Sequence, residues 1–347
     1  MMTPGYLTYF AFALVCLLLL TLPFVPAFRE WLHPTDSGAL PISSSYTSDI
    51  DHFARRLDAD ARARLGTGPL TGFEDFDFVT QPVEAMDLRN APKRMISSDI
   101  QSEEPVHCGP PLYVDGSIHA GPKSAFSALY ATGCIALGAQ SEIRDWGHAE
   151  DVLVLNDNSV AMRRISAGSA VELGNETWFE RVQAPVVHFG SGRGRRGFSG
   201  GARNQKEAGF DELPDSVMQT PLLYIVRGNC TLPASRIYRG SLVVTGFLIV
   251  GAGTTVIGDI KAREGISIAK GAEVQGAVTC EKRVYMFDDS MVSGPLVSES
   301  DILIGTNAVI GRPDALTTIS ARNIIVEDGV VAHGAVWAHE IGMVKAA

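Results

Sequence analysis

Residues 248–310 read LIVGAGTTVIGDIKAREG ISIAKGAEVQGAVTCEKR VYMFDDSMVSGPLVSESD ILIGTNAVI when they are divided into blocks of 18. The first, third and ninth columns are apolar, and the seventh column holds Thr254, Ala272, Ser290 and Ala308. The period continues through the stretch without a slip. An internal repeat of this length is typical of a solenoid, in which each repeat forms one structural unit.

The residue types within a block indicate β-structure. Apolar residues in the first and third columns flank a second column in which the residue type varies. This alternation has a period of two residues, which is the period of a strand. Gly, Asp or Asn then precedes the small residue, and this composition favours a tight turn. A second short strand follows, as in Val256–Ile260 and Val274–Val278. One block therefore predicts one coil of a β-helix, and the fold class is all-β.

The same columns occur earlier in the chain, so the sequence predicts two runs of coils. Ile135, Leu153 and Val171 repeat the first column. We expect a first run over 113–188 and a second over 217–337, in which Pro313–Thr318 interrupts the phase once. A segment rich in Gly and Arg, 189–216, should form a flexible loop between them, and 338–347 should be a short tail.

Residues 1–28 form a predicted membrane anchor. Leu7–Phe28 contains no charged residue and has the length of a membrane-spanning helix. A cleaved signal peptide is the alternative, but no basic residue precedes the apolar run. Arg29 follows it, which favours a cytoplasmic location for the rest of the chain.

Residues 29–112 are predicted to form a linker with one helix. The helix is expected at about 48–65, with Ser48 as its N-cap and with Ile50, Phe53, Ala54, Leu57 and Ala61 as its apolar stripe. It could cap an open end of the solenoid or recruit a partner. The segment that follows is acidic and irregular.

Composition argues against several classes of function. The chain has 347 residues and a net charge of −10, so nucleic acid is not an expected partner. Its five cysteines lack the spacing of a zinc site. No hydrolase, metalloprotease or phosphate-loop motif is present, and we therefore predict no catalytic residue, cofactor or metal.

The repeat of this chain resembles the repeats of two protein families. Apolar or small residues recur at every sixth position from Val256, which is similar to the hexapeptide-repeat acyltransferases. Residues 265–278, GISIAKGAEVQGAV, look like the repeats of the bactofilins, which are polymer-forming cytoskeletal proteins of bacteria. The latter resemblance covers about 113–188 and 217–337. It implies a β-helix that assembles without nucleotide, attaches to membranes and acts as a scaffold.

The resulting hypothesis is a single-pass scaffold of the bacterial inner membrane that associates with itself and with envelope proteins. Open sheet edges at the ends of a stack favour pairing between molecules. Ile324, Val326 and Val336 of the last coil are the predicted assembly contacts. The alternative is an acyltransferase of the hexapeptide type, or a carbohydrate-binding accessory of envelope polysaccharide synthesis.

Overall fold

The structure is a computed structural model that describes residues 4–25, 29, 50–66, 76–79, 87–190 and 205–346. It divides into two compact units, Met1–Ser48 and Asp49–Ala347. The second unit holds every described strand, and each unit is considered by itself.

The first unit contains the apolar helix α1, Pro4–Thr21, and a 3-10 turn, η1, Leu22–Phe24. Pro23 lies at the start of η1, where proline lacks the amide needed to continue an α-helix. Within the part of the chain that the structure describes, none of the helices is both long and apolar enough to cross a membrane. The membrane-spanning part of the prediction for Leu7–Phe28 is therefore unsupported.

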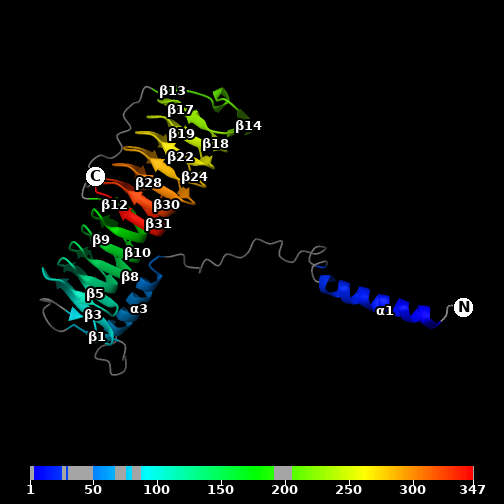
Figure 1. The fold of residues 1–347 in the computed structure, drawn as a ribbon. Coiled ribbons are helices and arrows are strands. Elements are labelled where there is room, and N and C mark those ends of the chain that lie inside the picture. Colours follow the sequence, from blue (N-terminus) through cyan, green and yellow to red (C-terminus); the bar gives the residue numbers. More distant parts are fainter. Residues whose placement is uncertain are drawn as a thin grey trace. The chain divides into compact units, whose positions relative to one another are not determined.

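The second unit is a β-solenoid, as the repeat predicts (Figure 1). Its first run begins at Phe76, earlier than expected, because the acidic segment also contributes strands. The strands of this run are β1 Phe76–Phe78, β2 Asp87–Leu88, β3 Arg94–Gln101, β4 His107–Cys108, β5 Leu112–Ala120, β6 Ala125–Ala131, β7 Ile135–Leu137, β8 Glu142–Ala149, β9 Val152–Leu155, β10 Val160–Ala167, β11 Ala170–Leu173 and β12 Trp178–Phe189.

The second run ends later than expected, because the predicted tail forms part of its last strand. The short 3-10 helix η2, Phe210–Glu212, lies near its start. The strands are β13 Lys206–Glu207, β14 Ser216–Thr220, β15 Leu223–Val226, β16 Cys230–Leu232, β17 Arg236–Arg239, β18 Ser241–Val244, β19 Phe247–Val250, β20 Thr255–Ile257, β21 Ile260–Ala262, β22 Gly265–Ile268, β23 Glu273–Val274, β24 Val278–Cys280, β25 Val284–Met286, β26 Met291–Val292, β27 Leu296–Ser298, β28 Asp301–Ile304, β29 Val309–Ile310, β30 Thr317–Val326 and β31 Val331–Val344.

The register confirms the columns of the sequence. Leu248 pairs with Ile266, Ile266 with Val284, and Val284 with Ile302, all in parallel. The next partner of Ile302 is Ile324, so the coil resumes after the interruption at Pro313–Thr318. These side chains are fully buried. Each coil thus hides its apolar face only by stacking on its neighbours, which makes the core continuous along the run.

One corner of each coil needs a left-handed backbone. Ser235, Gly253, Gly271, Asp289 and Asn307 have φ between 54° and 64° and lie 18 residues apart. Glycine adopts this conformation without steric cost, and Asn and Asp tolerate it better than most residues. The Gly, Asn and Asp signals in the repeat therefore mark a real turn column.

The two runs meet head to head within one chain. Strand β12, the last of the first run, pairs with β31, the last of the second run, in antiparallel orientation. Figure 1 shows the two runs joined at these strands. The junction is buried, with Val182 opposite Val336 and with Gly342 against the ring of Phe179. The chain therefore folds as two solenoid runs whose final coils cover each other.

This junction corrects the prediction for the last coil. Ile324 and Val326 pair with β28 on one side and β31 on the other, and Val336 pairs with Ile319 and Val182. None of the three lies at an open end, because β12 of the same chain already occupies that edge. Sequence reasoning missed this because the two strands share no repeat period.

Candidate functional site

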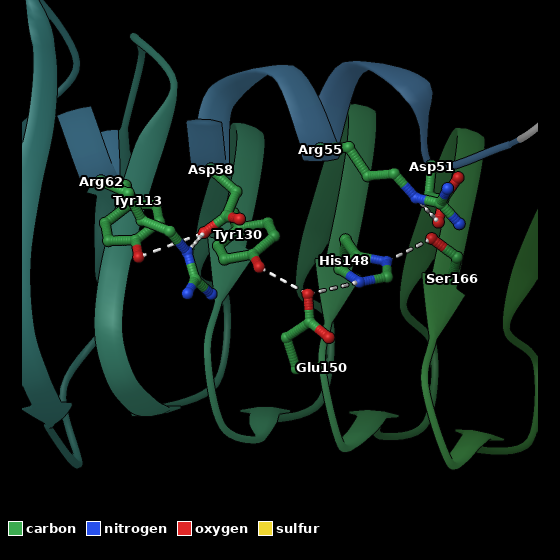
Figure 2. A network of polar contacts seen from close by, with 9 residues as sticks. All are labelled: Asp51, Arg55, Asp58, Arg62, Tyr113, Tyr130, His148, Glu150 and Ser166. Atoms are coloured by element: carbon green, nitrogen blue, oxygen red, sulfur yellow. Dashed lines mark hydrogen bonds and ion pairs between the residues drawn. The ribbon is translucent and has the colours of Figure 1, made fainter. Parts of the chain in front are cut away.

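A column of four side chains lies on the outer face of the first run, beneath the helix α3, His52–Gly66 (Figure 2). Tyr113 of β5 pairs in register with Tyr130 of β6, which pairs with His148 of β8, which pairs with Ser166 of β10. Parallel coils place equivalent residues directly above one another. Side chains separated by 17 or 18 residues therefore become neighbours here.

The rings of this column stack. Tyr113 and Tyr130 lie 5.2 Å apart between centroids and are almost parallel, and Tyr130 and His148 lie 5.5 Å apart. The tyrosines are fully buried, and His148 is nearly so. Stacking in this geometry adds to the free energy gained by burying the rings.

Glu150 joins the column to the polar surface beside it. The Tyr130 hydroxyl donates to Glu150 Oε1 over 2.6 Å, and His148 Nε2 lies 3.6 Å from the same oxygen. On its other side, His148 Nδ1 is 2.8 Å from Ser166 Oγ. Both ring nitrogens of His148 thus face polar partners, which offsets the cost of burying an imidazole.

Helix α3 supplies the cover. Ala54, Leu57 and Ala61 lie three and four residues apart, face the column and are buried, whereas Phe53 of the predicted stripe is 49% exposed. The helix lies over β5, β6 and β8, so it covers a face of the solenoid and not an end. The expectation of an end cap is therefore wrong. Ser48, the predicted N-cap, lies outside the described residues.

Charged groups of the helix complete the contact. Asp58 accepts hydrogen bonds from Arg62 Nε over 2.6 Å and from the Tyr113 hydroxyl over 3.3 Å. Arg55 Nε donates to Asp51 over 2.7 Å near the start of the helix, as Figure 2 shows. Arg94 of β3 forms an ion pair with Asp60. The helix is therefore held by an apolar stripe and by hydrogen bonds that run beside it.

Burial keeps the column uncharged. It raises the pKa of Tyr113 to about 12, and it raises the pKa of Tyr130 further, with help from the hydrogen bond to Glu150. Burial lowers the pKa of His148, although the carboxylates of Glu150 and Asp51 act in the opposite direction. At neutral pH all three rings are neutral hydrogen-bonding groups.

Ser166, His148 and Glu150 resemble a hydrolytic triad in composition only. A nucleophilic hydroxyl must reach a substrate, but Ser166 and His148 are only 5% and 6% exposed. The tyrosines and the helix occupy the space beside them. The column contacts α3 through the hydrogen bond of Tyr113 to Asp58. It was not identified from the sequence, although the spacing of Tyr130, His148 and Ser166 was visible in it.

His148 should make the protein less stable in mild acid. Its pKa in the folded state lies below the value of about 6.5 in an unfolded chain. The contribution of the neutral ring to stability is therefore complete above pH 6.5 and is lost as the pH falls below it. We expect the melting temperature to fall as the pH decreases below about 6.5, and to fall less in His148→Gln.

Exposed His339 provides the matched control for this measurement. His339→Gln should keep the wild-type dependence on pH. An equal fall in His148→Gln and in the wild type would show that His148 does not couple protonation to folding.

Searches with the whole chain found no matching family model, no similar curated protein and no similar solved structure.

Proposed function

We propose that this protein is a scaffold that associates end to end with copies of itself and is attached to a membrane by residues 7–28. The observation that carries the proposal is the junction of β12 with β31, where final coils pair edge to edge within one chain. An edge of this kind can pair in the same way with another molecule, because strand pairing depends on backbone groups. The resemblance to bactofilins supports the same function.

Strand β14 is the proposed contact. It pairs with β15 in antiparallel orientation, and β15 is its only partner strand among the described residues. Val217 and Met218 on β14 are 51% and 61% exposed. An edge strand with exposed apolar side chains favours pairing with another edge. Two β14 strands from two copies could pair antiparallel about a twofold axis, which would close a dimer.

The core beneath this end is already covered. Phe210 of η2 is buried and stacks on Tyr238, with 4.9 Å between ring centroids, and it lies 5.3 Å from Tyr224. The apolar column is therefore closed by η2. We propose that contact at β14 uses the strand edge and its exposed side chains while the core of each copy stays intact.

The proposed membrane attachment rests on residues 7–28, which carry no charge. The apolar side chains described in α1 and η1 are exposed within their own unit. A cytoplasmic location for the solenoid follows from Arg29 through the charge bias of membrane topology. The proposal places the scaffold on the bacterial inner membrane, where it would organise envelope proteins.

The full chain, taken from carbonate-washed membranes into detergent, provides the test. We expect Val217→Lys and Met218→Lys to weaken self-association by about tenfold or more, because symmetric pairing brings the new charges together. Light scattering over a range of concentrations would measure this, and electron microscopy would show the assemblies.

Ile249→Lys is the matched control, because Ile249 is also exposed but lies on β19 inside the second run. It should assemble like the wild type. Assemblies of unchanged size in both β14 variants, or a wild-type chain that stays monomeric throughout, would contradict the contact at β14. Release of the chain by carbonate would contradict the attachment.

A further inference from the structure

A second column of outward side chains crosses the junction between the two runs. Trp146 of β8 pairs in register with Arg164 of β10, which pairs with Arg181 of β12. Arg181 then pairs across the antiparallel junction with Trp337 of β31. Arg164 and Arg181 therefore lie on neighbouring strands, which are about 4.8 Å apart along the stack, and an aromatic residue lies on the strand at either side of them.

Both guanidinium groups lie against aromatic rings. Arg164 is 5.0 Å from the centroid of Phe53, which α3 contributes, and Arg181 is 3.7 Å from the centroid of Trp337. Stacking of this kind orients the planar group while its N–H edge can still donate hydrogen bonds. Each guanidinium group of the pair therefore has an aromatic ring against its face in the absence of a ligand.

The positive charge of this pair is not neutralised by an ion pair. Neither Arg164 nor Arg181 forms one with a carboxylate in the described residues, whereas Arg163 beside them pairs with Asp145 over 3.9 Å. Burial and the charge of Arg164 lower the pKa of Arg181, and Glu180 opposes them with a smaller effect. Two like charges held side by side attract an oxyanion, which two guanidinium groups can bind in bidentate fashion.

A hollow of about 240 Å³ adjoins Arg164. Phe53, Ala128 and Trp146 line it with apolar surface, and Ser127 and Asp145 line it with polar groups. Ser127 Oγ donates to Asp145 Oδ2 over 2.8 Å, and this carboxylate can accept further hydrogen bonds. The volume is below that of a usual site for a drug-sized molecule and suits one small ring.

We propose that this surface binds a saccharide unit that bears an acid group. The acid group would lie between Arg164 and Arg181, and the sugar ring would lie in the hollow against Trp146. Hydroxyl groups of the sugar would donate to Asp145. The protein has a net charge of −10, so it repels nucleic acid, which carries a negative charge on every phosphate. A saccharide with a single acid group is repelled less.

The site depends on α3, because Phe53 lies on that helix. It also needs β12, which carries Arg181 at the head-to-head junction. The inference does not rest on the proposed self-association, and binding can be measured on the protein at any assembly state.

The test uses the full chain in detergent and trigalacturonate, an acidic trisaccharide, as the probe. Calorimetry should show binding, and the tryptophan fluorescence of the chain should change on titration, since Trp146 and Trp337 both lie at the site. A neutral trisaccharide, inorganic phosphate and a single-stranded oligonucleotide should bind at least about tenfold more weakly. Arg164→Gln combined with Arg181→Gln should weaken binding of trigalacturonate by about tenfold or more.

Arg239→Gln combined with Arg263→Gln removes the same charge from exposed positions of the second run and should leave the affinity unchanged. The doubly lysine-substituted site, Arg164→Lys with Arg181→Lys, keeps the charge but loses the bidentate geometry, so it should bind with intermediate affinity. Melting curves check that each variant folds.

Four outcomes would overturn the proposal. The first two are a neutral trisaccharide that binds as tightly as trigalacturonate, and an unchanged affinity for trigalacturonate in Arg164→Gln combined with Arg181→Gln. The other two are inorganic phosphate that binds as tightly as trigalacturonate, and an oligonucleotide that binds more tightly than trigalacturonate through the same two arginines. The last two would assign the arginine pair to free oxyanions or to nucleic acid.

Discussion

Val182→Asp should destabilise the folded protein by roughly 3–5 kcal/mol, because it places an unpaired charge inside the junction of the two runs. Val182 is fully buried between Ile165 of β10 and Val336 of β31. No neighbouring coil can move aside, since β12 is paired on both edges. Chemical denaturation followed by circular dichroism would measure the loss.

Gln183→Glu is the control for this variant. Gln183 is the next residue on β12 and is exposed, so a carboxylate there remains in water. Its unfolding midpoint should stay close to that of the wild type. If Val182→Asp had the same midpoint as this control, β12 and β31 would not form the buried contact described above.

Val274→Asp should have a similarly large effect, roughly 3–5 kcal/mol, within the second run. Val274 is fully buried and pairs with Val256 and Val292 in the coils on either side. A charge at this position disturbs three consecutive coils. In a solenoid each coil depends on its neighbours, so the loss should spread along the run.

Lys270→Ala is the matched change at a corner of the same coil. Lys270 lies on the surface and pairs with Asp289 over 3.4 Å. An exposed ion pair of this kind contributes about 0–1 kcal/mol, so the variant should unfold almost like the wild type. Similar unfolding midpoints for Val274→Asp and Lys270→Ala would contradict the inward orientation of Val274.

The substitutions at the buried residues Val182 and Val274 together test whether the two runs unfold cooperatively. If the junction couples the runs, each variant should give one unfolding transition. If the runs unfold separately, Val274→Asp should shift only the transition of the second run, while Val182→Asp should weaken the contact between them. The large buried junction favours the first result, since neither final coil keeps its apolar face covered without the other.

The position of α3 shows what a local pattern can and cannot predict. The stripe of Ala54, Leu57 and Ala61 is spaced like one face of a helix, and this spacing is visible in the sequence. The surface that the stripe covers was not predictable in the same way. Tyr113, Tyr130 and His148 become one column only when the coils have stacked.

The amino-acid repeat was enough to predict the coils, because their contacts join residues 18 positions apart and each contact repeats in the next block. Strand alternation and the left-handed corner residues are local consequences of side-chain type, so the columns from Leu248 to Ile310 could be placed before the structure was known. The pairing of β12 with β31, in contrast, is visible only in the folded chain. Antiparallel pairing of two strand edges uses backbone groups that every residue carries, and it therefore leaves no periodic signal in the chain. The Arg164–Arg181–Trp337 column depends on that meeting, since its members come from both runs.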